Sequence, residues 1–74
     1  MHTLTIRTKF TFGDRVAFDS RAQGFSGSGK VVAITADADG RVDYIIDIGQ
    51  GEYSDLQPGI YEDEMKLLEA ADPR

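Results

Sequence analysis

The stretch from residue 29 to residue 49, GKVVAITADADGRVDYIIDIG, constrains the fold of this chain more than any other. It contains two runs rich in β-branched residues, and Asp39-Gly40 lies between them. Two such runs around a glycine-containing turn predict a β-hairpin. A two-residue turn at Asp39-Gly40 would set Val32 opposite Asp47, which mixes carboxylates with apolar side chains on one face. The apolar pattern therefore argues against that turn.

A three-residue loop over residues 38–40 gives the hairpin a consistent register. A slip of one residue would turn every side chain to the opposite face, so the apolar pattern decides between the two turns. Gly40 takes the left-handed position of the turn, which glycine adopts without a steric penalty. The predicted pairs on the core face are Ala36 with Val42, Ile34 with Tyr44 and Val32 with Ile46. The predicted pairs on the other face are Thr35 with Asp43, Ala33 with Ile45 and Val31 with Asp47.

The chain before the hairpin predicts two further extended pieces. Residues 3–12 alternate, and they place Leu4, Ile6, Phe10 and Phe12 on one face of a half-buried segment. After a turn at Gly13-Asp14, residues 15–19 form a strand with Val16 and Phe18 pointing inward. Residues 20–29 are rich in glycine and serine, which predicts a loop. Phe25 is the large apolar residue of that loop, and we expect it to pack beneath it.

The chain after the hairpin is harder to interpret. Residues 52–59 predict a loop with one short strand, and Pro58-Gly59 predicts a turn. Residues 60–70 fit two structures. One is a tight turn at residues 62–64 followed by a short strand over 65–68, and the other is a helix, which the composition favours. We expect the turn and strand.

These segments together resemble the SH3-like small β-barrels, the group that includes KOW, Tudor-like and photosystem I subunit IV-like domains. The segments that carry the resemblance are Gly13–Val16, Gly27–Ile34, Tyr44–Ile48 and Glu62–Leu68. The resemblance implies one all-β domain of about five short antiparallel strands, with a single 3₁₀ turn before the last strand. It divides the chain into an extended N-terminal segment (residues 1–11), a barrel (12–69) and a polar tail (70–74). The chain departs from peptide-binding SH3 domains because it has no Trp.

Composition narrows the classes of function. The 74 residues include no Cys and one His, His2, so no thiolate or histidine cluster can hold zinc or act in catalysis. Gly24–Lys30 fails as a phosphate-binding loop because Val31 stands where Ser or Thr is needed. The acidic residues from Asp37 onward do not fit the spacing of a calcium loop. We therefore expect a protein that is not an enzyme and needs no cofactor or metal. No apolar run approaches the ~20 residues of a membrane helix, so we expect a cytoplasmic protein that makes no membrane contact.

The charges are distributed unevenly, and they suggest candidate binding residues. Residues 1–36 carry a net charge of +3, whereas residues 37–74 carry −8. The candidate basic face consists of Arg7, Lys9, Arg15, Arg21 and Lys30. The candidate partner-binding residues are Phe25, Tyr53, Tyr61, Glu62 and Asp63, because exposed aromatic residues favour protein interfaces.

Three functions follow from these residues. The leading hypothesis is a small module for protein–protein interaction, such as an accessory protein of a phage or mobile element. The second is a nucleic-acid-associated domain of the KOW type, which the net charge of −5 disfavours. The third is an acidic inhibitor of a basic nucleic-acid-binding protein, with a field supplied by the acidic half of the chain. The protein is expected to be a monomer or an edge-paired homodimer.

Overall fold

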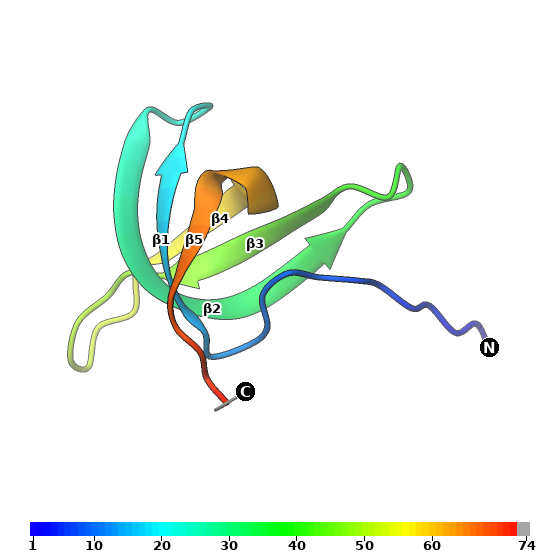
Figure 1. Cartoon of the computed structure of the whole chain (residues 1–74), viewed down its shortest axis with the longest axis horizontal. Helices are drawn as coiled ribbons and strands as arrows, with labels where there is room; N and C mark the ends of the chain where they lie inside the picture. Colours follow the sequence, from blue (N-terminus) through cyan, green and yellow to red (C-terminus); the bar gives the residue numbers. More distant parts are fainter. Residues whose placement is uncertain (73–74) are drawn as a thin grey trace.

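The computed structural model describes residues 1–72, and it consists of one antiparallel sheet of five strands. The sheet has the order β4-β3-β2-β1-β5 and is strongly curved (Figure 1). A single 3₁₀ turn, η1, precedes the last strand. The structure confirms the predicted all-β class, the five antiparallel strands and the 3₁₀ turn. The elements are β1 (Arg15–Ser20), β2 (Phe25–Ala36), β3 (Val42–Asp47), β4 (Leu56–Tyr61), η1 (Glu62–Glu64) and β5 (Met65–Glu69).

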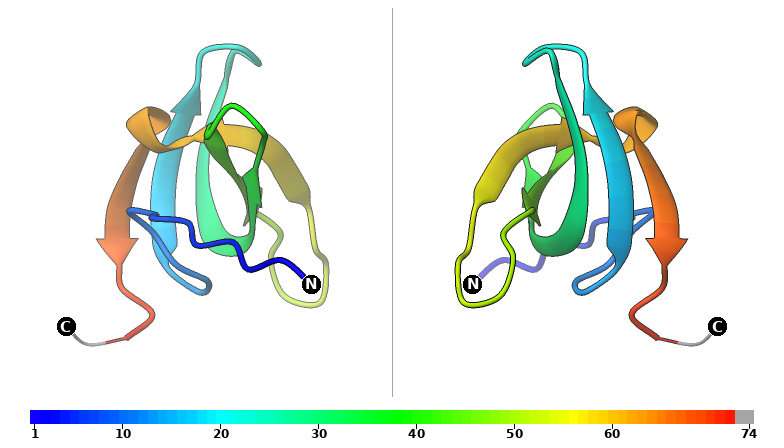
Figure 2. Two further views of the ribbon diagram at one scale, coloured as in Figure 1. Left: turned by 90° about the vertical axis from the view of Figure 1, so that its right-hand side faces the viewer. Right: turned by 90° about the vertical axis from the view of Figure 1, so that its left-hand side faces the viewer.

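Strand β2 joins the two halves of the sheet. Its first half pairs with β1 from Phe25 to Lys30, and its second half pairs with β3 from Lys30 to Ala36. It bends sharply along its length, so that the β1 ladder and the β3 ladder face each other (Figure 2). The prediction of a loop over residues 20–29 is therefore wrong from Phe25 onward. Residues 25–30 pair with β1 through their backbone groups, and this pairing does not require apolar side chains. A small residue is favoured at position 27, because the ring of Phe18 lies over Gly27.

The register of the β2–β3 hairpin is confirmed near its turn and wrong beyond it. Ala36 pairs with Val42 and Ile34 pairs with Tyr44, as predicted. A β-bulge then intervenes, and Val31 rather than Val32 pairs with Ile46. Val31 is only 1% exposed, whereas Val32 is 43% exposed. A bulge adds one residue to a strand and bends it, and the bend of β2 occurs in this part of the strand.

The turn of the hairpin is fixed by Asp37. Its carboxylate accepts hydrogen bonds from the backbone N–H groups of Asp39 and Arg41, each at 3.0 Å. Gly40 has a φ of +81°, which matches the predicted left-handed position. The Asp37 side chain therefore shapes the backbone of this turn.

The core lies inside the curve of the sheet. Seven buried apolar residues form it, and Tyr44, Ile46, Ile60 and Val16 are fully covered. Ile34 and Val42 pack against this cluster and are partly buried. The core residues are Phe10, Val16, Phe18, Val31, Tyr44, Ile46 and Ile60.

The N-terminal segment departs most from its prediction. Phe10 is buried, at 8% exposure, but Leu4, Ile6 and Phe12 are exposed. Residues 1–8 form no strand, and they run away from β5, past the end of the β2–β3 hairpin (Figures 1 and 2). Alternation makes a segment competent to form a strand, but it forms one only when a neighbouring edge is within reach. Of the predicted polar tail, residues 73–74 lie outside the described part of the chain.

The C-terminal part follows the prediction of a turn and a strand, and the helix is not formed. η1 and β5 occupy nearly the predicted ranges, and β5 pairs with β1. The predicted turn at Pro58-Gly59 is wrong, because both residues lie within β4. Proline is tolerated there because β4 is an edge strand, and Gly59, with a φ of +74°, lies beside a bulge.

Candidate functional site

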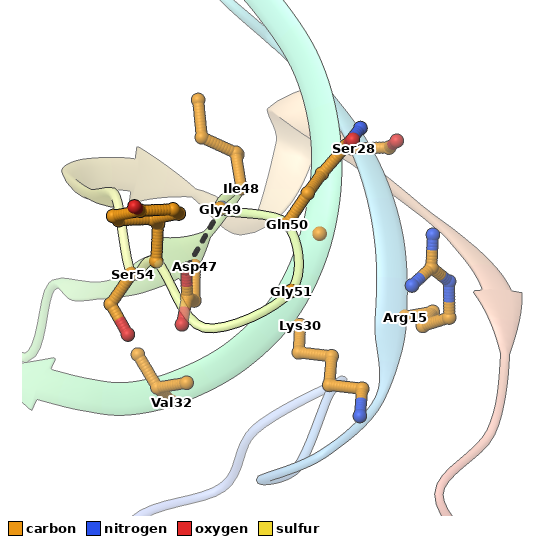
Figure 3. A pocket seen from close by; sticks show the side chains of 12 residues that line it. Arg15, Ser28, Lys30, Val32, Asp47, Ile48, Gly49, Gln50, Gly51 and Ser54 are labelled. Atoms are coloured by element: carbon orange, nitrogen blue, oxygen red, sulfur yellow. Dashed lines mark hydrogen bonds between the residues drawn. The ribbon is translucent and has the colours of Figure 1, made fainter.

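A hollow of about 450 Å³ lies where β1 and β2 meet the loop that follows β3 (Figure 3). It is lined on one side by Arg15 of β1 and Lys30 of β2, and on the other by Asp47 and Ser54. Tyr53, Val32 and Ile48 add an aromatic ring and two aliphatic side chains to the lining. We call this feature the basic hollow. Its remaining lining residues are Ser28, Gly29, Gly49, Gln50 and Gly51.

Two close backbone approaches shape the basic hollow. A Cβ atom on Gly29 would lie 2.1 Å from the carbonyl oxygen of Asp47. A Cβ atom on Gly49 would lie 2.0 Å from the carbonyl oxygen of Tyr53. No side chain fits at such distances, so both positions require glycine. These contacts hold β2 against the end of β3, and they fold the loop back over it.

The loop of the basic hollow is also anchored by Asp47. Its carboxylate accepts hydrogen bonds from the backbone N–H of Gly49 at 2.9 Å and from that of Asp55 at 3.0 Å. These bonds, first that from Asp55 and then that from Gly49, lower the pKa of Asp47, and nearby Lys30 adds a small effect. Asp47 thus remains charged, and its carboxylate oxygen accepts the hydrogen bonds that hold the loop.

The basic hollow brings two cations, Arg15 and Lys30, next to each other. Arg15 and Lys30 are direct cross-strand partners, and both are exposed. Like charges directly opposite each other on a sheet are destabilising. Asp47 and Glu69 are their neighbours on the adjoining strands, yet within residues 1–72 no carboxylate lies within salt-bridge distance of either cation. An anion in the hollow would offset this repulsion.

The exposed apolar groups of the hollow lie next to these cations. Tyr53 is 83% exposed, which is far more than a structural tyrosine at a barrel rim requires. Val32, displaced from the core by the bulge, adds an exposed aliphatic surface. The arrangement offers a flat apolar contact beside two positive charges.

The other candidate aromatic residues lie elsewhere and are partly used by the fold. Phe25 begins β2, and its ring centroid lies 5.9 Å from that of Phe18. Tyr61 ends β4 and is half-buried, with the guanidinium of Arg41 at 4.9 Å from the centre of its ring. The structure therefore does not bring Phe25, Tyr53 and Tyr61 together.

Glu62 takes part in a partly buried network of hydrogen bonds. Its carboxylate accepts hydrogen bonds from the hydroxyl of Tyr44 and, at 2.7 Å, from the backbone N–H of Lys9. The Tyr44 hydroxyl in turn accepts a bond from the N–H of Phe10, at 3.4 Å. Burial, and next the bond to Glu62, raise the pKa of Tyr44 to about 12. This network attaches the N-terminal segment to the core.

The rest of the acidic turn is occupied by Arg21. The guanidinium of Arg21 lies 2.9 Å from the carboxylate of Asp63, and its backbone N–H donates to Glu64 at 2.9 Å. The bond from Arg21, followed by that from the N–H of Tyr61, lowers the pKa of Glu64. The turn over residues 62–64 and Arg21 therefore bind each other. We call this set, together with Tyr44 and Lys9, the acidic clamp.

The structure thus divides the predicted basic face. Arg15 and Lys30 lie together in the hollow, Arg21 belongs to the acidic clamp, and Arg7 and Lys9 lie on the N-terminal segment. Sequence analysis missed Val32 and Gln50 as lining residues. The sequence predicted a loop over residues 52–59, but not that the chain from residue 49 folds over β2.

Comparison of the chain with protein-family models, curated proteins and solved structures finds no match. Among residues 1–72, no three side chains of the His, Cys, Asp and Glu types are grouped so that they could hold a metal ion. In the same residues no helix has the length and apolar character needed to cross a membrane. The functional argument therefore rests on the geometry of this chain.

Proposed function

We propose that this protein is a non-enzymatic binding module that recognises another protein through the basic hollow. One observation carries the proposal: Arg15 and Lys30, which form no ion pair within residues 1–72, border the same hollow as the exposed ring of Tyr53. Tyrosine and arginine are enriched where proteins bind one another. The two glycine-dependent contacts fix the hollow in place, so the site is formed before a partner binds.

The lining defines the chemistry of the partner. A carboxylate would bind between the two cations through charge-assisted hydrogen bonds. An aromatic or aliphatic side chain next to it would cover Tyr53 and Val32. The partner segment therefore combines an acidic residue with an adjacent large apolar residue.

Nucleic acid is the second candidate ligand, and the same residues favour it. A base could stack on Tyr53 while a phosphate binds Arg15 and Lys30, as in proteins that bind single strands. The overall charge of −5 opposes this reading, because a long polyanion is repelled by the whole protein, whereas one carboxylate contacts only the hollow. A protein partner is therefore the better proposal.

The acidic inhibitor remains a prediction that the geometry does not favour. Glu62, Asp63 and Glu64 accept bonds within the acidic clamp, and Asp47 accepts bonds from its own loop. Four carboxylates of the predicted acidic field are thus already in use.

The test is selection of peptides from a random library on the immobilised protein, followed by NMR titration. We expect the selected peptides to share an acidic residue beside a large apolar one, and to shift the amide signals of Ser28 and of residues 49–51. The double variant Arg15→Ser/Lys30→Ser should lose this binding, and Arg41→Ser, outside the hollow, should keep it. Peptides whose binding is unaffected by the double variant would contradict the proposal.

A second arm of the same experiment tests nucleic acid. Fluorescence anisotropy with a short single-stranded oligonucleotide at low salt should show no saturable binding. Binding that weakens steeply with salt and is lost in the double variant would show that the hollow binds nucleic acid and would contradict the protein partner.

A further inference from the structure

Residues 1–8, which we call the N-terminal arm, lie outside the sheet. In the part of the chain that the structure describes, no backbone N–H or carbonyl of the arm has a hydrogen-bond partner. The arm sequence, MHTLTIRT, alternates threonine with apolar residues, which is typical of strands. The arm therefore has the composition of a strand, but it pairs with no other strand.

The sheet offers a free edge at β5. One side of β5 pairs with β1, and its other side leaves alternate backbone groups without a partner in the sheet. Leu67 and Leu68 on this strand are 41% and 54% exposed. The opposite edge, β4, contains Pro58, which has no N–H and protects that edge against further pairing. The edge open to strand addition is β5.

We propose that the arm of one copy of this chain adds as an antiparallel strand to β5 of a second copy, and that the second copy does the same in return. The product is a symmetric dimer with two arm–β5 ladders. Main-chain hydrogen bonds supply the attraction, and the side chains of the arm set the register.

The apolar pattern and the charges select one register. Met65 and Leu67 pair with Phe18 and Val16 and so share the core face, which Leu4 and Ile6 of the arm must extend. Placing Leu4 opposite Leu67 also sets Ile6 opposite Met65 and Thr5 opposite Lys66. A shift that sets Ile6 opposite Leu67 would place Arg7 opposite Lys66, and like charges oppose each other there.

The overall charges of the two surfaces are complementary. The arm carries Arg7 and no acidic residue, whereas residues 62–69 carry a net charge of −3. In the selected register, Arg7 lies beyond the start of β5 and next to the acidic turn. His2 then lies opposite Glu69, at the far end of the strand.

The direction of the arm favours a second copy over its own β5. Phe10 is held in the core, and the N–H of Lys9 is held by Glu62, so the arm starts from a fixed point. From there it runs away from β5, toward the tip of the β2–β3 hairpin (Figures 1 and 2). Leu4 and Ile6 line a shallow hollow with Ala36 and Val42 at that tip. The arm therefore lies beside the hairpin of its own molecule, away from its own β5, and has no backbone hydrogen bond there.

Sedimentation equilibrium over a concentration series tests this inference. The full chain should reach twice the mass of the chain, and a truncated chain beginning at Lys9 should remain a monomer. The truncation leaves every buried residue in place, and circular dichroism confirms folding. Leu67→Asp should also give a monomer, and the matched change Leu56→Asp on β4, where the side chain is also exposed (52% against 41%), should keep the dimer.

Mixing the two monomeric variants makes the test specific. The truncated chain keeps an intact β5, and the Leu67→Asp chain keeps its arm, so the mixture should form a heterodimer. Hydrogen exchange of the β5 amides should be slower in the full chain than in the truncated one.

Three results would overturn the inference: a full chain that stays monomeric at every concentration, a dimer that survives the truncation, or protected β5 amides in a monomer. The last would mean that the arm closes on its own β5. None of these measurements involves the basic hollow, so the inference and the proposed function can fail separately.

Discussion

The acidic clamp and the basic hollow both combine a tyrosine with charged side chains, and they use them in opposite ways. In the acidic clamp, Tyr44 is fully buried and bonded to Glu62, and Arg21 is paired with Asp63. In the basic hollow, Tyr53 is exposed and Arg15 faces Lys30. The comparison shows that residue type alone does not mark a binding site. What distinguishes the hollow is that its two cations, Arg15 and Lys30, form no ion pair with any carboxylate of residues 1–72.

The largest effect should come from the backbone contact that forms the hollow. Gly29→Ala would place a Cβ atom within 2.1 Å of a backbone carbonyl, which cannot move without separating β2 from β3. We expect a loss of about 3 kcal/mol in the free energy of unfolding, the upper end for overpacking. Urea denaturation followed by circular dichroism measures it.

The control for this change is Gly27→Ala. There the added atom meets only the ring of Phe18, at 3.3 Å, and the ring can shift. Equal losses at the two positions would show that the contact between Gly29 and Asp47 is not special.

The two tyrosines give the most direct comparison of the two regions. Tyr44→Phe removes a buried hydroxyl and leaves Glu62 without its donor, so we expect a loss of about 1–3 kcal/mol. Tyr53→Phe removes an exposed hydroxyl and should change stability by less than about 0.5 kcal/mol. Thermal or urea unfolding of both variants decides the matter. Similar losses of stability in the two variants would contradict the distinction between the structural acidic clamp and the free basic hollow.

Acid should weaken the acidic clamp. The pKa of Glu64 in the folded protein lies below its ordinary value of 4.5, because backbone N–H groups stabilise the charged form. Its contribution is therefore complete above pH 4.5 and is lost as the pH falls through the folded pKa. The urea midpoint should decrease between about pH 5 and pH 3, and the decrease should be smaller in Glu64→Gln. An unchanged slope in that variant would assign the acid sensitivity to other carboxylates.

The smallest effects are expected from the two arginines, and they should differ in sign. Arg21→Ala removes exposed ion pairs, so the melting temperature should fall by at most a few degrees. Arg15→Ala removes a cation that faces Lys30, so the melting temperature should stay the same or rise slightly. Differential scanning calorimetry at low salt makes the contrast largest. A fall for Arg15→Ala would show that this side chain has a structural role.

The parts of the fold that the sequence predicted are those governed by local rules. Asp37 and Gly40 define the hairpin turn, and the apolar pattern places Ile34 opposite Tyr44. The pattern could not reveal the bulge at Val32, because both Val31 and Val32 are apolar and either could face the core. Alternation in residues 3–12 predicted a packed segment, but the segment runs away from the free edge at β5 and pairs with no strand of its own molecule.

The candidate site was predicted only in part, for a similar reason. Arg15, Lys30 and Tyr53 were all candidates, but so were Arg21, Glu62 and Asp63, which the acidic clamp occupies. The distinction depends on contacts between residues about 40 positions apart, such as that of Arg21 with Asp63. The sequence alone does not show which of its distant charged residues contact one another in the fold.

The shared strand β2 has a consequence for how the molecule comes apart. β2 pairs with β1 along one half and with β3 along the other, and the two ladders meet at Lys30, next to the bend. Opening either ladder exposes Val31, which is buried at the bend. We therefore expect the sheet to unfold as one cooperative unit, with the slowest hydrogen exchange in the central part of β2. The loop over residues 49–54 lies outside this unit, and its bonds to Asp47 and the close contact at Gly49 keep the basic hollow formed beside the intact sheet.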